Sequence, residues 1–78
     1  MLDLKKTQKE VLKVLVEHEG QRLGTRDIMR FCKVNPHHIY QAICFFMDNN
    51  LVYQPDSQDR VEISPDGMDY ARQYSRVR

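Results

Sequence analysis

The sequence predicts a single, mainly α-helical domain with one small β-hairpin, in the order helix, helix, helix, strand, strand, helix. Three observations predict this fold class: helix-starting residues at four places, apolar residues at helical spacing after them, and one alternating strand pattern around a polar turn. The 78 residues fit one domain, 1–78, with one modest core. A chain this short buries only about 60 to 65% of its unfolded surface, so two independent domains are not expected.

The first helix is predicted to begin at TQKE, residues 7–10, which has the form of a capping box. Thr7 would accept a hydrogen bond from a free amide of the first turn, while Glu10 would reach back to the cap. Gly20 stands where a helix commonly ends. The apolar residues between these signals recur at helical spacing and predict a buried face: Val11, Leu12, Leu15 and Val16.

A second helix, of about two turns, is predicted to follow a cap at Thr25. Its apolar residues Ile28, Met29 and Cys32 are expected to share one face. A turn of about three residues then leads to the sharpest boundary in the chain, VNPHH.

At that boundary Asn35 can cap a third helix, and Pro36 suits its first position because the amide that proline lacks would be unpaired there. The helix should run to about Asp48, where Asn49 and Asn50 can end it in a left-handed turn. Its predicted buried side consists of Ile39, Ala42, Ile43 and Phe46. The opposite side carries His37, His38, Gln41, Cys44 and Asp48.

The segment LVYQPDSQDRVEI, residues 51–63, predicts two short strands joined by a polar turn that contains Pro55, Asp56 and Ser57. SPDG then starts a fourth helix that extends to about residue 75: Ser64 can cap it, and Pro65 suits its first position. Asp66 complements the positive end of the helix dipole.

This succession resembles the winged helix-turn-helix superfamily (α-α-α-β-β-α) over residues 7–76. The segment NPHHIYQAICFFMDNNLVYQ is similar to the reading helix and first wing strand of that superfamily, with Asn50 where a glycine is usual. VEISPDGMDYA resembles the second wing strand and final helix of MarR-like and PadR-like regulators, in whose pattern L-T-x-x-G the residues Ile63, Ser64 and Gly67 find places. The resemblance implies a small transcription regulator that binds specific sites on double-stranded DNA.

Charge is distributed unevenly along the chain, although its net value is only +1. Residues 1–33 carry eight Lys or Arg against five acids, a net of +3, and residues 34–66 carry one Arg against five acids, a net of −4. The last twelve residues have a net of +2. Because phosphates attract positive charge, this pattern predicts modest, salt-sensitive DNA affinity unless two copies bind together.

In a helix-turn-helix the first helix of the pair crosses the phosphate backbone and the second enters the major groove. Arg22, Arg26 and Arg30 recur every four residues, and Lys33 falls near the same angle, so they could form one phosphate-binding stripe. An ordinary solvated face, with Asp27 nearby, explains the same spacing equally well. In the turn between the strands, Arg60 could also contact a phosphate.

The third helix contains no Arg or Lys between Val34 and Asp48, so it cannot make the commonest specific contact, that of a cation with guanine. The candidates for contacts in the groove are Asn35, His37, His38, Tyr40 and Gln41. Asn or Gln can read adenine, whereas His and Tyr can reach phosphates or bases. The alternative is that Asn35 serves only as a cap and that both His are exposed polar residues without a role.

The ends of the chain are a candidate homodimer interface, formed by Leu2, Leu4, Tyr70, Tyr74 and Val77. Packing of these side chains within a single copy is the alternative. A different function is also open: the acidic middle segment, with Asp56, Asp59 and Glu62, could dock a basic protein partner.

Enzymatic activity is not expected, because the chain has no Gly-rich phosphate loop, nucleophile elbow or paired His and carboxylate motif. No metal or other cofactor is expected either, since His37 and Cys44 are about 10 Å apart along a helix axis. No apolar stretch approaches the length of a membrane span, and no export signal is visible. These features, with two cysteines expected to be free thiols, predict a cytoplasmic protein.

Overall fold

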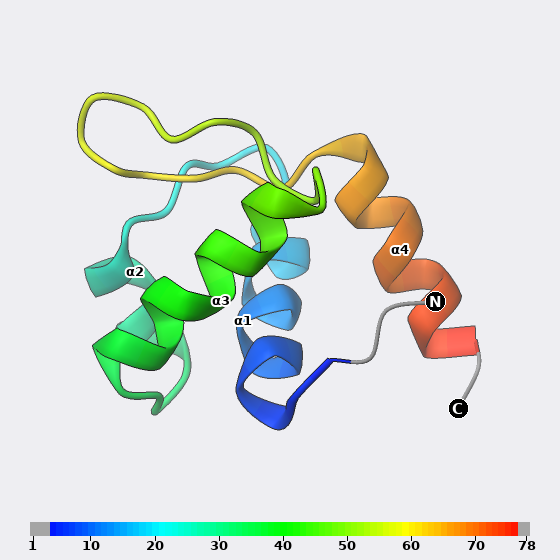
Figure 1. Cartoon of the computed structure of the whole chain (residues 1–78), viewed down its shortest axis with the longest axis horizontal. Helices are drawn as coiled ribbons and strands as arrows, with labels where there is room; N and C mark the ends of the chain where they lie inside the picture. The colour runs from blue at the N-terminus through cyan, green and yellow to red at the C-terminus, as the bar shows by residue number, and fades with distance from the viewer. Residues whose placement is uncertain (1–3, 77–78) are drawn as a thin grey trace.

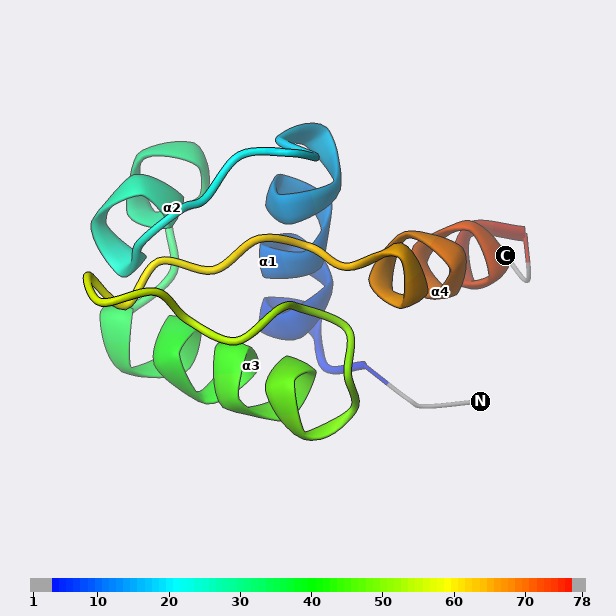
Figure 2. The same cartoon turned by 90° about the horizontal axis from the view of Figure 1, so that it is seen from above.

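The computed structural model describes residues 4–76, and the side chains of residues 4–73. This part of the chain forms four helices: α1 (Lys6–Glu17), α2 (Thr25–Phe31), α3 (Pro36–Asp48) and α4 (Pro65–Arg76) (Figure 1). α1 occupies the centre and packs against the other three, and α2 also packs against α3. α4 lies on one side of α1, and α2 and α3 lie on the other (Figure 2). None of these helices has the length and apolar character needed to cross a membrane.

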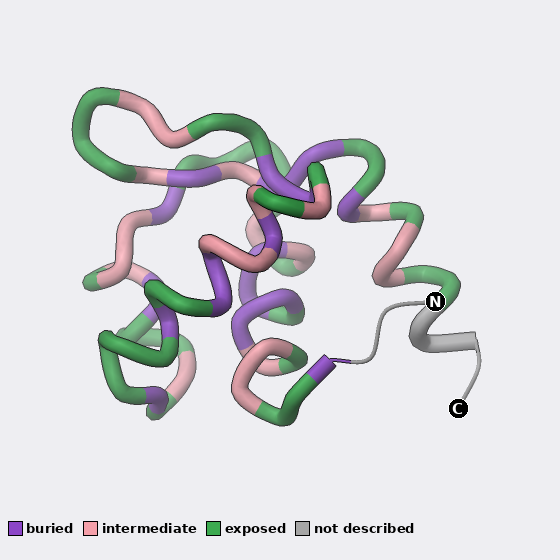
Figure 3. Tube along the Cα trace, viewed as in Figure 1, coloured by how far each residue is buried: buried purple, intermediate pink, exposed green. Residues whose placement is uncertain are grey.

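The core lies where the inner faces of the helices meet (Figure 3). Its largest fully buried side chains are Phe46, Leu15, Ile28, Ile39, Val11 and Val61. All four residues predicted to form the buried side of α3 are in this core, as are Val11, Leu12 and Leu15 of α1. The apolar spacing therefore identified the correct faces of both helices.

Met29 does not share the buried face of α2 with Ile28, so that prediction was wrong. Ile28 is fully buried, whereas Met29 is 42% exposed. Consecutive residues on a helix point about 100° apart, and a helix of two turns has room for only a narrow buried stripe. Cys32, just beyond the end of α2, is half-buried against the core.

Two predicted helix caps were also wrong. The N-cap of α1 is Lys5, whose amide donates to Oε1 of Gln8 at 2.8 Å, and Thr7 lies within the helix. The N-cap of α2 is Gly24, whose amide donates to Oδ2 of Asp27 at 3.0 Å. In both helices the backbone amide of the cap residue donates a hydrogen bond to the side chain three residues later. Any residue except proline has such an amide, so the cap position does not require Ser or Thr.

The predicted boundaries of α3 are confirmed. The amide of His37 donates to Oδ1 of Asn35 at 2.8 Å, and Pro36 is the first helical residue. At the other end Nδ2 of Asn49 donates to the carbonyl of Phe45 at 2.8 Å, and Asn50 has a φ of 60°. Asn tolerates this left-handed conformation better than other residues with a β-carbon, which explains why it can end α3 in place of glycine.

The segment between α3 and α4, residues 51–63, is called the wing below. It forms the predicted hairpin only in part: Val52 and Ile63 make an isolated antiparallel bridge, and the amide of Tyr53 donates to the carbonyl of Glu62 at 2.9 Å. A second isolated bridge pairs Val61 with Leu23, in two hydrogen bonds of 2.8 Å. The second limb of the wing therefore pairs with the first limb through Ile63 and with the segment before α2 through Val61.

The junction between the wing and α4 is built around Ser64, as its predicted cap role requires. Its buried hydroxyl accepts from the amide of Gly67 at 3.1 Å and donates to the carbonyl of Asn50 at 2.9 Å. A β-carbon added at Gly67 would collide with the carbonyl of Leu51 and lie 2.7 Å from Cγ1 of Ile63. Glycine at this position therefore allows the first turn of α4 to lie directly against Leu51 and Ile63, the two ends of the wing.

We expect Gly67→Ala to lower the free energy of unfolding by about 1 to 3 kcal/mol, because the added methyl group has no space. Chemical denaturation in urea measures this change. Gly24→Ala is the matched control, since its β-carbon would lie in ordinary contact, 3.5 Å from Cγ of Arg60. Equal losses in the two variants would contradict the importance of the Gly67 contact.

Candidate nucleic-acid interface

The outer face of α3 carries four exposed polar or aromatic side chains near the start of the helix: His37, His38, Tyr40 and Gln41. All four are exposed on a helix whose opposite side is in the core, and none is a permanent cation. This face can therefore donate and accept hydrogen bonds, but it has little fixed charge with which to attract phosphate.

Two of the five candidate side chains on α3 form a hydrogen-bonded pair. Nε2 of Gln41 lies 3.2 Å from Nε2 of His37, one helical turn away. The amide of His37 is itself held by Oδ1 of Asn35, which is therefore committed to capping through that oxygen. The ring of His38 lies 6.2 Å from that of His37, measured between centroids.

Tyr40 lies on the outer face of α3. It is 62% exposed, and the pKa of its hydroxyl is raised first by a side-chain hydrogen bond with Cys44. The negative charge of Asp59, in the wing, raises that pKa as well.

Three exposed cations accompany α2: Arg26 and Arg30, one turn apart, and Lys33 just beyond its end. Within the part of the chain that the structure describes, none of them makes an ion pair. Asp27, the acid nearest to them in sequence, uses Oδ2 to accept from the amide of Gly24 instead. Their charge is therefore available to a partner outside the chain.

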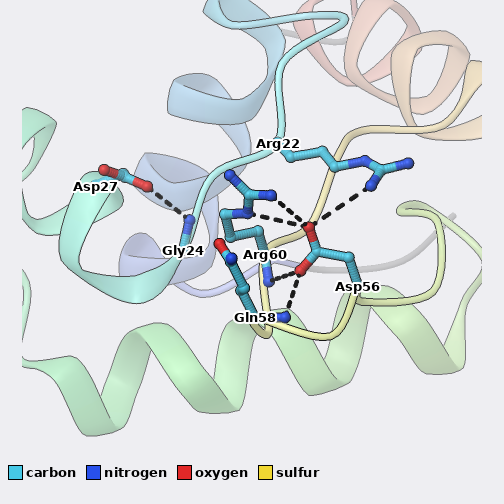
Figure 4. Close-up of polar contacts among 6 residues, drawn as sticks. All are labelled: Arg22, Gly24, Asp27, Asp56, Gln58 and Arg60. Atoms are coloured by element: carbon cyan, nitrogen blue, oxygen red, sulfur yellow. Dashed lines mark hydrogen bonds and ion pairs between the residues drawn. The ribbon is translucent and has the colours of Figure 1, made fainter.

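Arg22 and Arg60 lie elsewhere, on either side of a single carboxylate (Figure 4). Oδ2 of Asp56 is 3.0 Å from both Nε and Nη2 of Arg60 and 3.6 Å from Nη1 of Arg22. Its other oxygen accepts from the amides of Gln58 and Arg60 at 2.9 and 3.0 Å. Asp56 therefore contacts both the turn of the wing and the two arginines, and the guanidinium of Arg22, in the segment before α2, faces the wing.

This role of Asp56 was missed in the sequence, where the residue suggested only a turn and a negative charge. Two signals in PDSQDR pointed to it: an aspartate two residues before an amide it can accept from, and an arginine four residues further on. The backbone amide of Arg60 is the main reason that the pKa of Asp56 is lowered from its ordinary value of 3.8. Partial burial acts in the opposite direction and raises this pKa, whereas the amide of Gln58 and the guanidinium of Arg60 lower it further.

The predicted dimer residues have different surroundings. Leu4 is 7% exposed and belongs to the core of the single chain, and Tyr70 is half-buried against that core. Leu2, Val77 and the side chain of Tyr74 lie outside the described residues. The homodimer interface stays a prediction.

Among the described residues, no group of three or more His, Cys, Asp or Glu side chains could hold a metal ion. Cys32 and Cys44 are free thiols, and both are half-buried. Burial, followed by the charge of Glu10, raises the pKa of Cys32, whose Sγ donates to the carbonyl of Ile28 at 3.4 Å. A raised thiol pKa opposes formation of the reactive thiolate.

No protein-family model and no curated protein matches this chain in sequence. Two solved structures match its fold. MepR, described as a transcription regulator of the Staphylococcus aureus multidrug efflux pump MepA, superposes with a TM-score of 0.78 and 18% identity, over 96% of this chain and 58% of that one. A mutant of Lactococcus lactis ZitR superposes with a TM-score of 0.72 and 18% identity, over 95% of this chain and 52% of that one. This chain therefore spans little more than half the length of either.

At 18% identity these likenesses concern the fold. They confirm a mainly helical fold of four helices like that of these two proteins, as expected for a winged helix, whereas the hairpin of the wing is formed only in part.

The geometry around Asp56 predicts a stability difference that depends on pH. A folded-state pKa below 3.8 means that the ionised carboxylate stabilises the fold. Its contribution is complete well above pH 3.8 and is lost as the pH falls through that value towards the lowered pKa of the folded state. Thermal unfolding of the wild type and Asp56→Asn, followed from neutral to acidic pH, should show a gap in midpoint that narrows below this value. A gap of constant size would contradict the pairing.

Proposed function

We propose that this chain is a winged-helix domain that binds double-stranded DNA and regulates transcription, acting in the cytoplasm and without enzymatic activity. One observation carries the proposal: Arg26 and Arg30 on α2, the helix packed against α3, and Lys33 just beyond its end are exposed without an internal acidic partner among the described residues. In a helix-turn-helix this is the helix that crosses the phosphate backbone. MepR, one of the two solved structures of similar fold, is described as a transcription regulator, which supports the same proposal.

The proposed complex separates anchoring from reading. The cations beside α2 would bind phosphates on one side of α3, and Arg60 in the wing and Arg22 in the segment before α2 would bind others. The start of α3 would then enter the major groove with His37, His38, Tyr40 and Gln41, while Asn35 caps the helix. Binding to phosphates alone would be weak and sensitive to salt, because it involves few cations.

A homodimer would double the number of these contacts, and we propose the ends of the chain as its interface. α4 packs on α1, and it carries Tyr70 and Tyr74 one turn apart in the sequence. Docking of a basic protein through the acidic middle segment has less support. Asp56 already binds two arginines of its own chain, which leaves Asp59 and Glu62 as the wing acids for such a partner.

The double variant Arg26→Glu with Arg30→Glu tests the phosphate contacts. Its affinity for a labelled random-sequence duplex, measured by fluorescence anisotropy at several salt concentrations, should fall at least tenfold. The plot of log affinity against log salt has a negative slope, and its magnitude should become smaller by about 1.8 as two phosphate contacts are lost.

The matched control is Lys6→Glu with Arg72→Glu, which makes the same change in net charge at exposed positions of α1 and α4. This control should keep most of the affinity and the salt slope. Equal losses in both double variants would show a general charge effect, and no binding by the wild type at low salt would reject DNA binding.

A second pair of variants tests the wing. Asp59→Asn removes an exposed negative charge at a residue with a φ of 58°, a conformation that Asn also tolerates, and should strengthen DNA binding. Asp56→Asn removes the same charge but also releases Arg22 and Arg60, so it should bind more weakly than Asp59→Asn. The same anisotropy titration decides: equal affinities would show that Asp56 does not position the arginines for DNA.

A further inference from the structure

Gln41 and His37 form a hydrogen-bonded pair of side chains on the outer face of α3. The capping bond of 2.8 Å between Oδ1 of Asn35 and the amide of His37 fixes the backbone at the start of the helix. His37 then meets the Gln41 amide at 3.2 Å, although both side chains are exposed. A flexible exposed glutamine is thereby restricted to few orientations before any ligand arrives, which reduces the entropy lost on binding.

The chemistry of this pair fits one base better than the others. When the Gln41 amide donates one N–H to the unprotonated Nε2 of His37, it retains a second N–H and its carbonyl oxygen. One donor beside one acceptor is the complement of adenine in the major groove, which presents the acceptor N7 beside the donor N6 amino group. Guanine presents two acceptors there, so the Gln41 oxygen would face an oxygen.

The other side chains near the start of α3 are less able to read a base. Oδ1 of Asn35 is used in the cap, and Tyr40 offers a single hydroxyl group, which cannot make the two-point contact that an amide can make. His38 has a ring contact with His37 but no hydrogen bond that orients it among the described residues. The absence of Lys and Arg from α3 leaves guanine without its usual reader.

We propose that Gln41 determines specificity by reading an adenine in the major groove, and that His37 is the positioning residue that orients its amide. This inference rests on the proposed DNA-binding function and adds a base preference and a division of roles to it. The remaining contacts then supply affinity that is independent of that base pair.

The test starts with selection of bound duplexes from a random library by the full chain, followed by affinity measurements on the selected site and its single-base variants. The selected site should contain an adenine whose replacement weakens binding by the wild type by about five- to 150-fold, as expected for one bidentate contact. Gln41→Ala should bind both duplexes with nearly equal affinity. Gln41→Arg should change the preference at that one base pair from adenine to guanine.

Two further variants separate positioning from a general effect. His37→Ala should reduce the discrimination at the same base pair while keeping the salt dependence of non-specific binding. His38→Ala, which removes the adjacent imidazole, should leave that discrimination unchanged whatever it does to overall affinity. Equal loss of discrimination in both His variants would overturn the assignment of His37. Because all these side chains are exposed, unchanged melting temperatures confirm that the variants are folded.

The outcomes distinguish the two levels of the proposal. If no duplex is bound or enriched at low salt, the proposed function fails and the base preference fails with it. If duplexes are enriched but Gln41→Ala discriminates at every base pair as the wild type does, DNA binding stands and the adenine assignment is overturned.

Discussion

The arrangement of this domain depends on the buried hydroxyl of Ser64. It joins the end of α3 to the start of α4 by donating to the carbonyl of Asn50 and accepting from the amide of Gly67. The left-handed Asn50 and the missing side chain of Gly67 make that approach possible. Because both limbs of the wing attach at this junction, it also sets the direction in which the wing leaves the core. A capping residue here has a tertiary role as well as a local one.

The wing shows why charge counted along a sequence can mislead. Residues 34–66 carry a net charge of −4, which suggests a surface that repels phosphate. Asp56, however, accepts two backbone amides and binds two arginines, so its charge is used within the domain. The acid acts as the centre of a small basic group and keeps a segment with little β-structure in a defined shape. Its conservative replacement by Asn would change both the fold of the turn and the presentation of the arginines.

The proposed interface divides electrostatic anchoring from hydrogen-bonded reading. Cations occupy α2, the segment before it and the wing, whereas α3 offers neutral donors and acceptors. This division limits the affinity of one domain, since few phosphates are neutralised, and it makes a second copy or a longer chain valuable. It also means that specificity can rest on a few ordered side chains, of which His37 and Gln41 are already paired.

Local signals determined much of this fold by themselves. The apolar spacing identified the buried faces of α1 and α3, and the pairs Asn35–Pro36 and Ser64–Pro65 marked two helix starts, because these interactions span only a few residues. The same helical spacing also predicted which side chains of α3 are exposed. Only the tertiary structure decided that Leu23 pairs with Val61, that Met29 faces solvent and that Arg22 meets Asp56. Each of these depends on which distant segment packs beside a residue, and no nearby residue type specifies that.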